Sequence, residues 1–600
     1  MARGQSPPLP PFAMTLGIVG HRDELIAPHR ASIAARIDEA NDTLKASALA
    51  LHERERRWFD ASSPLLSLVS PLADGADQMA AQSAIDRGFA LQAILPFAVA
   101  TYCETLPDAT RASFERLLDK AACRFELPGD PRQPLQAYVM AGRATVAQAD
   151  ILIAVWDGQF PRGRGGTGEV VEWAIARGTP VLQIPIDPAA PMTLIWSAYD
   201  PAVITSHSSD IDRRPFERDQ VDALLVTLLS PPIDPRERGY LERFGRERRR
   251  NWRLRLEYPL LLAVTGVSRL GWATLRETAS ESAGDRDWHH DCAGCAGRHG
   301  VAVPLDLVGD THRWSDRLAS RYAQTYRSGH VLNFVLAASA VLIGLGGFLF
   351  AEARLWLAAI EFVLALTIIV NTRVGVAREW HRRWLDYRQL AERLRPFRSL
   401  KLVGIAAPDP PGSASNPVSR RWTEWYATAV WRAMGCASGA VTAAEVSGIA
   451  ASIATHEVDP QVSYHRRSSR QIMALDERLE RVSATIFIVT LLASVATIVA
   501  LVLAPQWVDR WQDWLTLVSA GLPAVGTAVF GIRFQGDFGG SALRSDATAT
   551  ALGDLSRELR RPALGLSRVA DLTEQAARAM FADLSEWRLV NQQHDLSISS

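Results

Sequence analysis

The chain has 600 residues, of which 48% are hydrophobic and 22% are charged, and this composition excludes a chain that is disordered throughout. Its 65 lysine and arginine residues balance 65 aspartate and glutamate residues, so the basic excess of a nucleic-acid-binding protein is missing and no nucleic-acid partner is expected. The five cysteines are few and mostly isolated, which favours a reducing compartment over a disulfide framework.

Residues 1–13 are rich in proline and contain no apolar run of signal-peptide length, so we expect a disordered leader that is not removed. From residue 14 to 200, strand-like apolar runs alternate with segments of helical periodicity. This alternation predicts an α/β Rossmann-like domain whose parallel sheet binds ligands beyond the carboxyl ends of its strands. The predicted strands are 15–19, 65–69, 91–95, 151–155 and 180–184, and helices are predicted near 28–51, 76–87, 109–121, 136–149 and 168–177.

Residues suited to binding a nucleotide follow three of the predicted strands. They are Gly20, His21 and Arg22 after the first strand, Gly75 and Asp77 after the second, and Asp157 and Gly158 after the fourth. An arginine can contact phosphate in a bidentate manner, and an aspartate can accept hydrogen bonds from ribose hydroxyl or amino groups. We therefore predict a nucleotide-derived ligand at this edge, with no cofactor required. Ordinary turns with a loop histidine are the alternative.

A glycine cluster after the fourth strand leads into a predicted helix. Gly163, Gly165 and Gly166 allow close backbone approach, and Thr167 can cap the helix that follows. The free amides at a helix start attract anions, so this loop is predicted to hold the phosphate of the ligand.

Four segments of this half resemble the SLOG family, a Rossmann-like superfamily that includes the cytokinin-activating phosphoribohydrolases and the DNA-processing protein A. They read GIVGHR, PLADGADQMAAQSAIDRG, ADILIAVWDG and GGTGEVVEWAIARGTPV, and the resemblance covers residues 14–190. It implies either a sensor of a nucleotide derivative or a hydrolase of a base–ribose bond.

In the hydrolase branch, the resemblance implies that an arginine before the glycine loop and a glutamate after it are catalytic. Arg143 matches the arginine, but Arg162 and Arg164 replace a proline and a glycine of the loop, and Val170 stands where the glutamate belongs. Glu169 comes one residue early, which turns a helical side chain by about 100°. We therefore expect sensing rather than turnover, with Arg143 and Glu169 catalytic only if the chain is a hydrolase.

Residues 201–312 form a connecting region. The apolar segment 259–272 follows a basic run and is too short to span a bilayer, so we expect it to lie on a membrane surface or to pack between domains. A solvated charged face is the alternative.

The connecting region also contains potential metal ligands. Enough of them for one tetrahedral zinc site lie within a single loop: His289, Cys292, Cys295 and His299. Because there is only one CxxC pair, a glycine-rich linker is the alternative, and zinc is not expected.

Four long apolar segments follow, at 331–350, 355–370, 482–504 and 514–532. A helix of about 20 residues spans a bilayer, so these segments predict two transmembrane helical hairpins, with buried core helices as the alternative. Arginines gather before and after each pair, whereas each turn contains a single arginine. The positive-inside rule then predicts a multi-pass membrane protein with both termini in the cytoplasm.

Two features of the spans indicate helix association. Small residues four apart, such as Ala340 and Gly344, let helices approach closely, and a homo-oligomer is expected. Glu361 lies about 10 Å inside the second span, where an ionisable residue usually faces a partner or water. We expect Glu361 to face an oligomeric pore or a polar helix contact, or to be a neutral glutamate near the interface.

The segments 378–395 and 458–487 resemble SLATT domains, two-helix membrane modules found beside SLOG domains in bacterial conflict systems. The resemblance covers residues 313–590 and implies a module at 313–400, a linker at 401–457 and a second module at 458–590. It implies a pore-forming or membrane-disrupting effector that a nucleotide signal opens, acting in antiphage defence, with the signal and the lipid bilayer as partners. A membrane-anchored phosphoribohydrolase and a degenerate scaffold without ligand are the alternatives.

Overall fold

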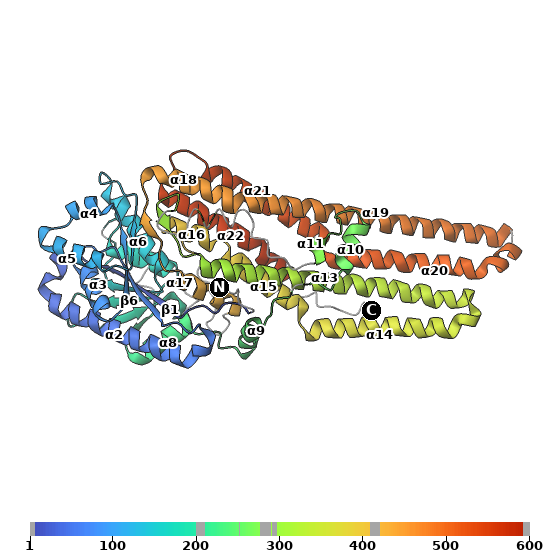
Figure 1. Cartoon of the computed structure of the whole chain (residues 1–600), viewed down its shortest axis with the longest axis horizontal. Coiled ribbons are helices and arrows are strands. Elements are labelled where there is room, and N and C mark those ends of the chain that lie inside the picture. Colours follow the sequence, from blue (N-terminus) through green and yellow to red (C-terminus); the bar gives the residue numbers. More distant parts are fainter. Residues whose placement is uncertain are drawn as a thin grey trace.

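The computed structural model describes residues 6–161, 163–199, 211–250, 252–275, 288, 290, 297–408, 421–503 and 505–591. The chain is elongated, with a sheet domain at one end and long helices that extend from the other (Figure 1). Further helices, among them α15, α16 and α22, lie between the sheet and the long helices (Figure 1).

The sheet contains ten strands in the order β8-β7-β6-β5-β1-β2-β3-β4-β10-β9. The strands from β6 to β10 in this order are parallel, and β7, β8 and β9 add antiparallel edges. Their bounds are β1 Ala13–Gly20, β2 Leu65–Ser70, β3 Ala90–Leu95, β4 Cys123–Glu126, β5 Ile151–Val155, β6 Val181–Ile184, β7 Thr193–Ile195, β8 Arg213–Pro215, β9 Val301–Ala302 and β10 Ser438–Ala440. Because β1 pairs with both β2 and β5, the strand order reverses at β1, which is where open α/β sheets bind ligands.

The central strands are almost continuously apolar because helices cover both faces of the sheet. Leu16 and Ile18 of β1 and Leu152 and Ile153 of β5 have no exposed surface. The covering helices are α2 Arg30–Glu55, α3 Ala76–Asp86, α5 Asp108–Asp119, α6 Pro134–Gln148, α7 Thr167–Ala176 and α8 Arg218–Leu229. The predicted parallel sheet and its five strands are thus confirmed, each strand to within two residues.

The sheet extends beyond the range 14–200 that the sequence suggested for this domain. Strands β8, β9 and β10 come from residues 213–440, and β10 pairs with β4 in parallel. These strands have two or three residues each, so they carry no periodic signal of their own. Part of the sheet is therefore built by the C-terminal half of the chain.

Two segments expected to be irregular are packed instead. Within residues 6–13, Phe12 is buried and the Pro8 carbonyl accepts a hydrogen bond from the Tyr426 hydroxyl, so this stretch is not a free leader. Within the range 401–457, expected to be a linker, α17 Trp422–Ala433 buries Trp422 and Trp425 in the core. The linker composition is confined to residues 407–417, whereas α17 itself contains no proline or glycine.

Four helices are long and apolar enough to cross a membrane, by length and composition. They are α13 Asp306–Leu349, α14 Arg354–Ala377, α19 Asp459–Leu503 and α20 Pro505–Gly536. At most 17% of any apolar window is buried within the chain, so these segments are not core helices. Helix α13 packs against α14, α19 packs against α20, and α13 also packs against α20, so that the two hairpins form a row (Figure 1).

After each hairpin the helix is interrupted at one residue, and a further helix, here called the returning helix, follows. Glu379 (φ 51°) separates α14 from α15 Trp380–Leu394, and Asp537 (φ 41°) separates α20 from α21 Phe538–Leu559. The left-handed backbone costs a residue with a Cβ about 1–2 kcal/mol, so it ends each helix sharply. Helix α15 then packs on α13, and α21 packs on α19, which gives the two halves of the helical region the same arrangement.

Candidate functional site

The carboxyl ends of β1 and β5 are joined by hydrogen bonds of His21. The His21 N–H donates to the Val155 carbonyl (3.1 Å), and its own carbonyl accepts from the N–H of Ala76 (3.3 Å). The N–H of Asp157 donates to His21 Nε2 at 3.4 Å, and Asp157 Oδ1 lies 3.4 Å from the same nitrogen. His21 therefore holds the loops after β1, β2 and β5 together, which is a positioning role.

Gly20 and Gly75 allow these loops to approach one another. A Cβ on Gly20 would lie 2.4 Å from the Ala76 Cβ, and a Cβ on Gly75 would lie 2.6 Å from the Asp23 backbone nitrogen. Gly75 also has a φ of +93°, which side-chain-bearing residues rarely adopt. Both glycines are thus explained by close packing where β1 meets the start of α3.

Arg22 and the glycine loop converge on Tyr138 of α6. The Arg22 guanidinium lies over the Tyr138 ring, 5.5 Å from its centroid, and its Nε is 3.9 Å from Asp74 Oδ1. A Cβ on Gly165 would lie 3.0 Å from the Tyr138 Cβ. The Arg22 side chain remains 57% exposed, so its charge is available to a ligand at this edge. Tyr138 was not predicted from the sequence. The feature that could have indicated it is an aromatic residue in the first turns of α6, the helix that leads into β5.

The glycine loop is held by Glu169. Helix α7 begins at Thr167, with Gly166 as its N-cap, so Thr167 is the first helical residue and its side chain does not cap the helix. The Glu169 carboxylate instead accepts a hydrogen bond from the N–H of Gly165, where φ is +73°. A Cβ on Gly163 would meet no atom within 4 Å, so this part of the loop is open. Gly158 (φ +78°) lies at the neighbouring turn beside Gln183, and Arg162 lies outside the described residues.

Asp77 is buried at the start of α3, with 4% of its surface exposed. Burial raises the pKa of its carboxyl to about 8, and the negative charge of Asp74 acts in the same direction. The buried Tyr102 nearby has a pKa well above 10, chiefly because of burial and secondly because of Asp77. Both groups are therefore uncharged at pH 7, which lowers the negative charge beside Arg22.

This raised pKa predicts a pH dependence of stability. Between about pH 4 and pH 8 the folded chain retains a proton on Asp77 that the unfolded chain releases, so the free energy of unfolding falls as the pH rises through this window. In Asp77→Asn the contribution is absent, and the variant should gain stability relative to the wild type as the pH rises. Thermal unfolding of both proteins from pH 5 to pH 8.5 measures the difference, with the exposed Asp86→Asn as control. Parallel profiles for wild type and Asp77→Asn would contradict the assignment.

The two candidate catalytic residues have separate partners. Arg143 pairs with Asp571 (2.7 Å) and Glu574 (3.5 Å) of α22 Leu566–Asn591, whereas Glu169 binds the glycine loop. Arg143 therefore links α6 to the helical region.

Of the four predicted zinc ligands, the structure describes only His299. Cys292, Cys295 and His289 are outside the described residues, and His299 lies against Gly448 of α18 Ala443–Ile453. The described part of the chain contains no group of three or more metal-binding side chains.

Glu361 lies on α14 with its carboxylate toward α13. A Cβ on Gly344 of α13 would lie 3.0 Å from Glu361 Oε2. The absence of a side chain at Gly344 thus makes room for the carboxylate within the hairpin. The apolar segment 259–272 contributes α10 Glu257–Val264, which packs on α13 near the start of the long apolar segments.

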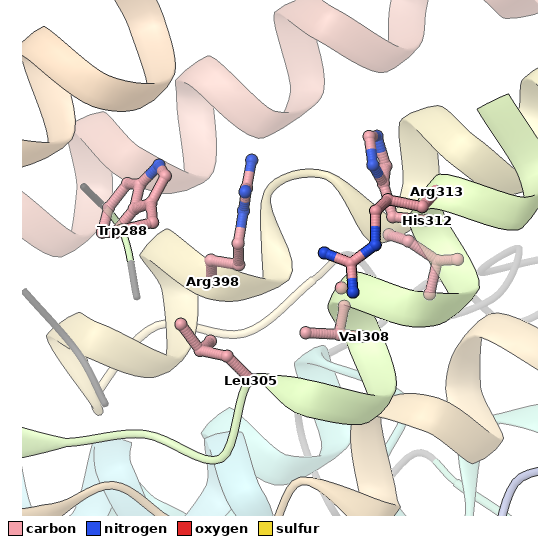
Figure 2. Close-up of a pocket in the computed structure, with 8 residues that line it drawn as sticks. Trp288, Leu305, Val308, His312, Arg313 and Arg398 are labelled. Atoms are coloured by element: carbon pink, nitrogen blue, oxygen red, sulfur yellow. The ribbon is translucent and has the colours of Figure 1, made fainter. Parts of the chain in front are cut away.

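A small cavity lies between α13 and α16 Phe397–Val403 (Figure 2). Its volume of about 10 Å³ is enough for about one water molecule. His312 lines it, and burial lowers the pKa of this imidazole well below 6.5, with Arg395 and Arg398 adding to the effect. Because it has room for only about one water molecule, the cavity is too small for a nucleotide.

The geometry defines a Rossmann-like sheet domain joined to a helical region with four long apolar helices. A family model for a protein of unknown function, DUF4231, matches residues 310–397, which cover most of α13 and all of α14 and α15. The chain is thus similar to this family over its first helical hairpin and returning helix. No curated protein matches the chain.

Proposed function

We propose that this chain is a sensor of a nucleotide derivative whose ligand controls a membrane pore or a membrane-disrupting assembly. The ligand binds at the carboxyl ends of β1 and β5, with phosphate at the glycine loop and Arg22. The four apolar helices cross the bacterial inner membrane as two hairpins with both termini in the cytoplasm. The resemblance to SLOG and SLATT families supports this reading, and a role in antiphage defence agrees with it.

One observation carries the proposal: the helices that begin at the candidate ligand site end at the helical region. Helix α6 holds Tyr138 near its start and Arg143 farther along, and α7 begins at the glycine loop and ends before Arg177. Arg143 and Arg177 both pair with Glu574 of α22, at 3.5 and 3.3 Å. A displacement of either helix start by a ligand would thus reach α22 through a direct ion pair.

The proposal requires different ligand affinities in two states of the spans, because a ligand that binds both states equally shifts nothing. A row of four helices with little burial leaves two long apolar faces for lipid or for further copies of the chain. We therefore propose a homo-oligomer in the membrane.

The test uses the full chain in liposomes loaded with a fluorescent dye. A defined pool of nucleotides, including cyclic dinucleotides and ADP-ribose derivatives, is added to the liposomes. The compounds retained by the protein and those left free in solution are then separated by chromatography. Retention of one intact compound together with dye release supports the proposal. Conversion of a compound to free base would make the chain a hydrolase, and dye release that is independent of every compound would contradict sensing.

A further inference from the structure

A second cavity lies between the two hairpins on the side of the sheet domain. It has a volume of about 410 Å³, within the range of ligand sites, and α10, α13, α15, α19 and α21 line it. Figure 1 shows α10 beside α13 and α19, where the long helices leave the region of α15 and α21. Every element that lines this interhairpin cavity thus belongs to the helical region.

The charged side chains of the interhairpin cavity are all basic. They are Arg269, Arg327, Arg388 and Arg544, and no carboxylate is among the described lining residues. Five serine hydroxyls lie on the same walls: Ser268, Ser320, Ser468, Ser541 and Ser545. Guanidinium groups and hydroxyls are the donors that proteins use for phosphate.

Two of the arginines are partly neutralised. Arg388 pairs with Asp316 at 3.2 Å and with Glu392 at 2.7 Å, and Arg544 pairs with Asp537 at 2.7 Å. The Nε of Arg544 is nevertheless buried and has no hydrogen-bond partner within the described residues. An unpaired buried donor destabilises the fold, and an acceptor bound in the cavity would offset this cost.

The other two arginines supply uncompensated charge. Among the described residues, no carboxylate forms an ion pair with Arg327 or Arg269. Arg327 is held between aromatic rings, with its guanidinium 4.9 Å from the Trp384 centroid and 5.4 Å from the Tyr258 centroid. These rings fix the guanidinium at the wall without using its N–H donors.

The position of Arg327 suits a ligand at the membrane surface. It lies four residues before Val331, where the apolar segment of α13 begins, and four helical residues correspond to about 6 Å. The polar layer of a bilayer extends about 5–8 Å beyond the hydrocarbon on each side, so Arg327 lies at the depth of lipid phosphates. Arg388 lies farther from the apolar segment of α13 than Arg327, since it pairs with Asp316, which precedes Arg327 on this helix.

We infer that the interhairpin cavity binds a phosphate ester, supplied either by the headgroup of an anionic lipid or by a soluble phosphorylated compound. Its donors come from α10 and its following loop, from α13 and α15 of the first hairpin module, and from α19 and α21 of the second. A bound phosphate would therefore connect the two modules and fix their separation. The lipid source depends on the proposed membrane topology, whereas the soluble source does not, and neither depends on the sheet edge.

The experiment uses the full chain in neutral detergent with two probes. Native mass spectrometry compares phosphatidylglycerol with phosphatidylcholine, and calorimetry measures binding of inorganic phosphate and pyrophosphate without lipid. We expect Arg327→Gln to weaken binding of the anionic probe by about 10-fold or more, because it removes a charge-assisted contact. The matched control is Arg373→Gln, an exposed arginine at the same end of the neighbouring helix α14.

Each result has a defined reading. Binding of phosphatidylglycerol alone identifies a headgroup site, and binding of inorganic phosphate or pyrophosphate without lipid identifies a soluble ligand. Equal binding by Arg327→Gln and Arg373→Gln, or equal retention of phosphatidylcholine and phosphatidylglycerol with no phosphate binding, would overturn the inference. If Arg327→Gln fails to fold, Arg269→Gln in the loop after α10 serves as the second variant. Unchanged binding in Arg22→Ala separates this site from the one proposed at the sheet edge.

Discussion

Replacement of Glu574 by alanine is expected to destabilise the chain by about 3 kcal/mol and to disconnect the sheet domain from the helical region. The Glu574 side chain is 9% exposed and lies 3.3 Å from Arg177 and 3.5 Å from Arg143. It also accepts a hydrogen bond from the buried N–H of Ala407 at 3.1 Å. Alanine would leave two guanidinium groups and one amide without this acceptor, and each loss adds to the cost.

The matched control for this prediction is Asp571→Ala. Asp571 is 44% exposed and pairs only with Arg143 in the described structure, so its loss should cost less than about 1 kcal/mol. Thermal unfolding in detergent compares the two variants with the wild type. Under the proposed function, Glu574→Ala should still retain the nucleotide ligand but release dye without responding to it. Equal stabilities of the two variants would show that Glu574 does not hold the interface.

Replacement of Arg22 by alanine is expected to weaken retention of the nucleotide ligand by about 10- to 100-fold, which corresponds to one lost hydrogen-bonded charge contact. Arg22 extends from the end of β1 over Tyr138, beside the glycine loop, and its side chain is 57% exposed. Its pairing with Asp74 is long, at 3.9 Å, so removal of the side chain should leave the stability of the fold almost unchanged.

A titration of ligand against full chain measures this effect, and Arg116→Ala is the control. Arg116 is an exposed arginine of α5 whose guanidinium bonds to its own helix. Arg22→Lys should recover part of the affinity, since it keeps the charge but not the bidentate geometry. Wild-type affinity in Arg22→Ala would place the ligand elsewhere, and the proposed site at the sheet edge would then be abandoned.

The central sheet could be predicted from the sequence because its strands are short, continuous apolar runs. Strand β4 could not, since Cys123–Glu126 contains only one strongly apolar side chain, Phe125. Strands β9 and β10 are specified by pairing with residues far away in the chain, and such pairing has no local pattern. The four apolar helices were visible from length and composition alone.

The candidate site could likewise be predicted from the sequence only in part. The sequence placed His21, Arg22 and the glycine cluster at strand ends, and the structure brings them to one edge. Tyr138 was missed because an aromatic residue in a helix is most often part of the core. The partner of Arg143 was missed because Glu574 is 431 positions later in the chain.

The arrangement of β9 and β10 has a consequence for the order of events during synthesis. Strand β9 ends at Ala302 and β10 begins at Ser438, and the whole first hairpin lies between them in the chain. A ribosome that adds about 5–20 residues per second needs about 7 to 27 seconds to traverse this interval. In the proposed topology, the first hairpin therefore enters the bilayer while β4 is still an open edge. Closure of that edge by β10 is a late step, so an arrested or truncated chain that ends before residue 438 would expose an unpaired strand to aggregation.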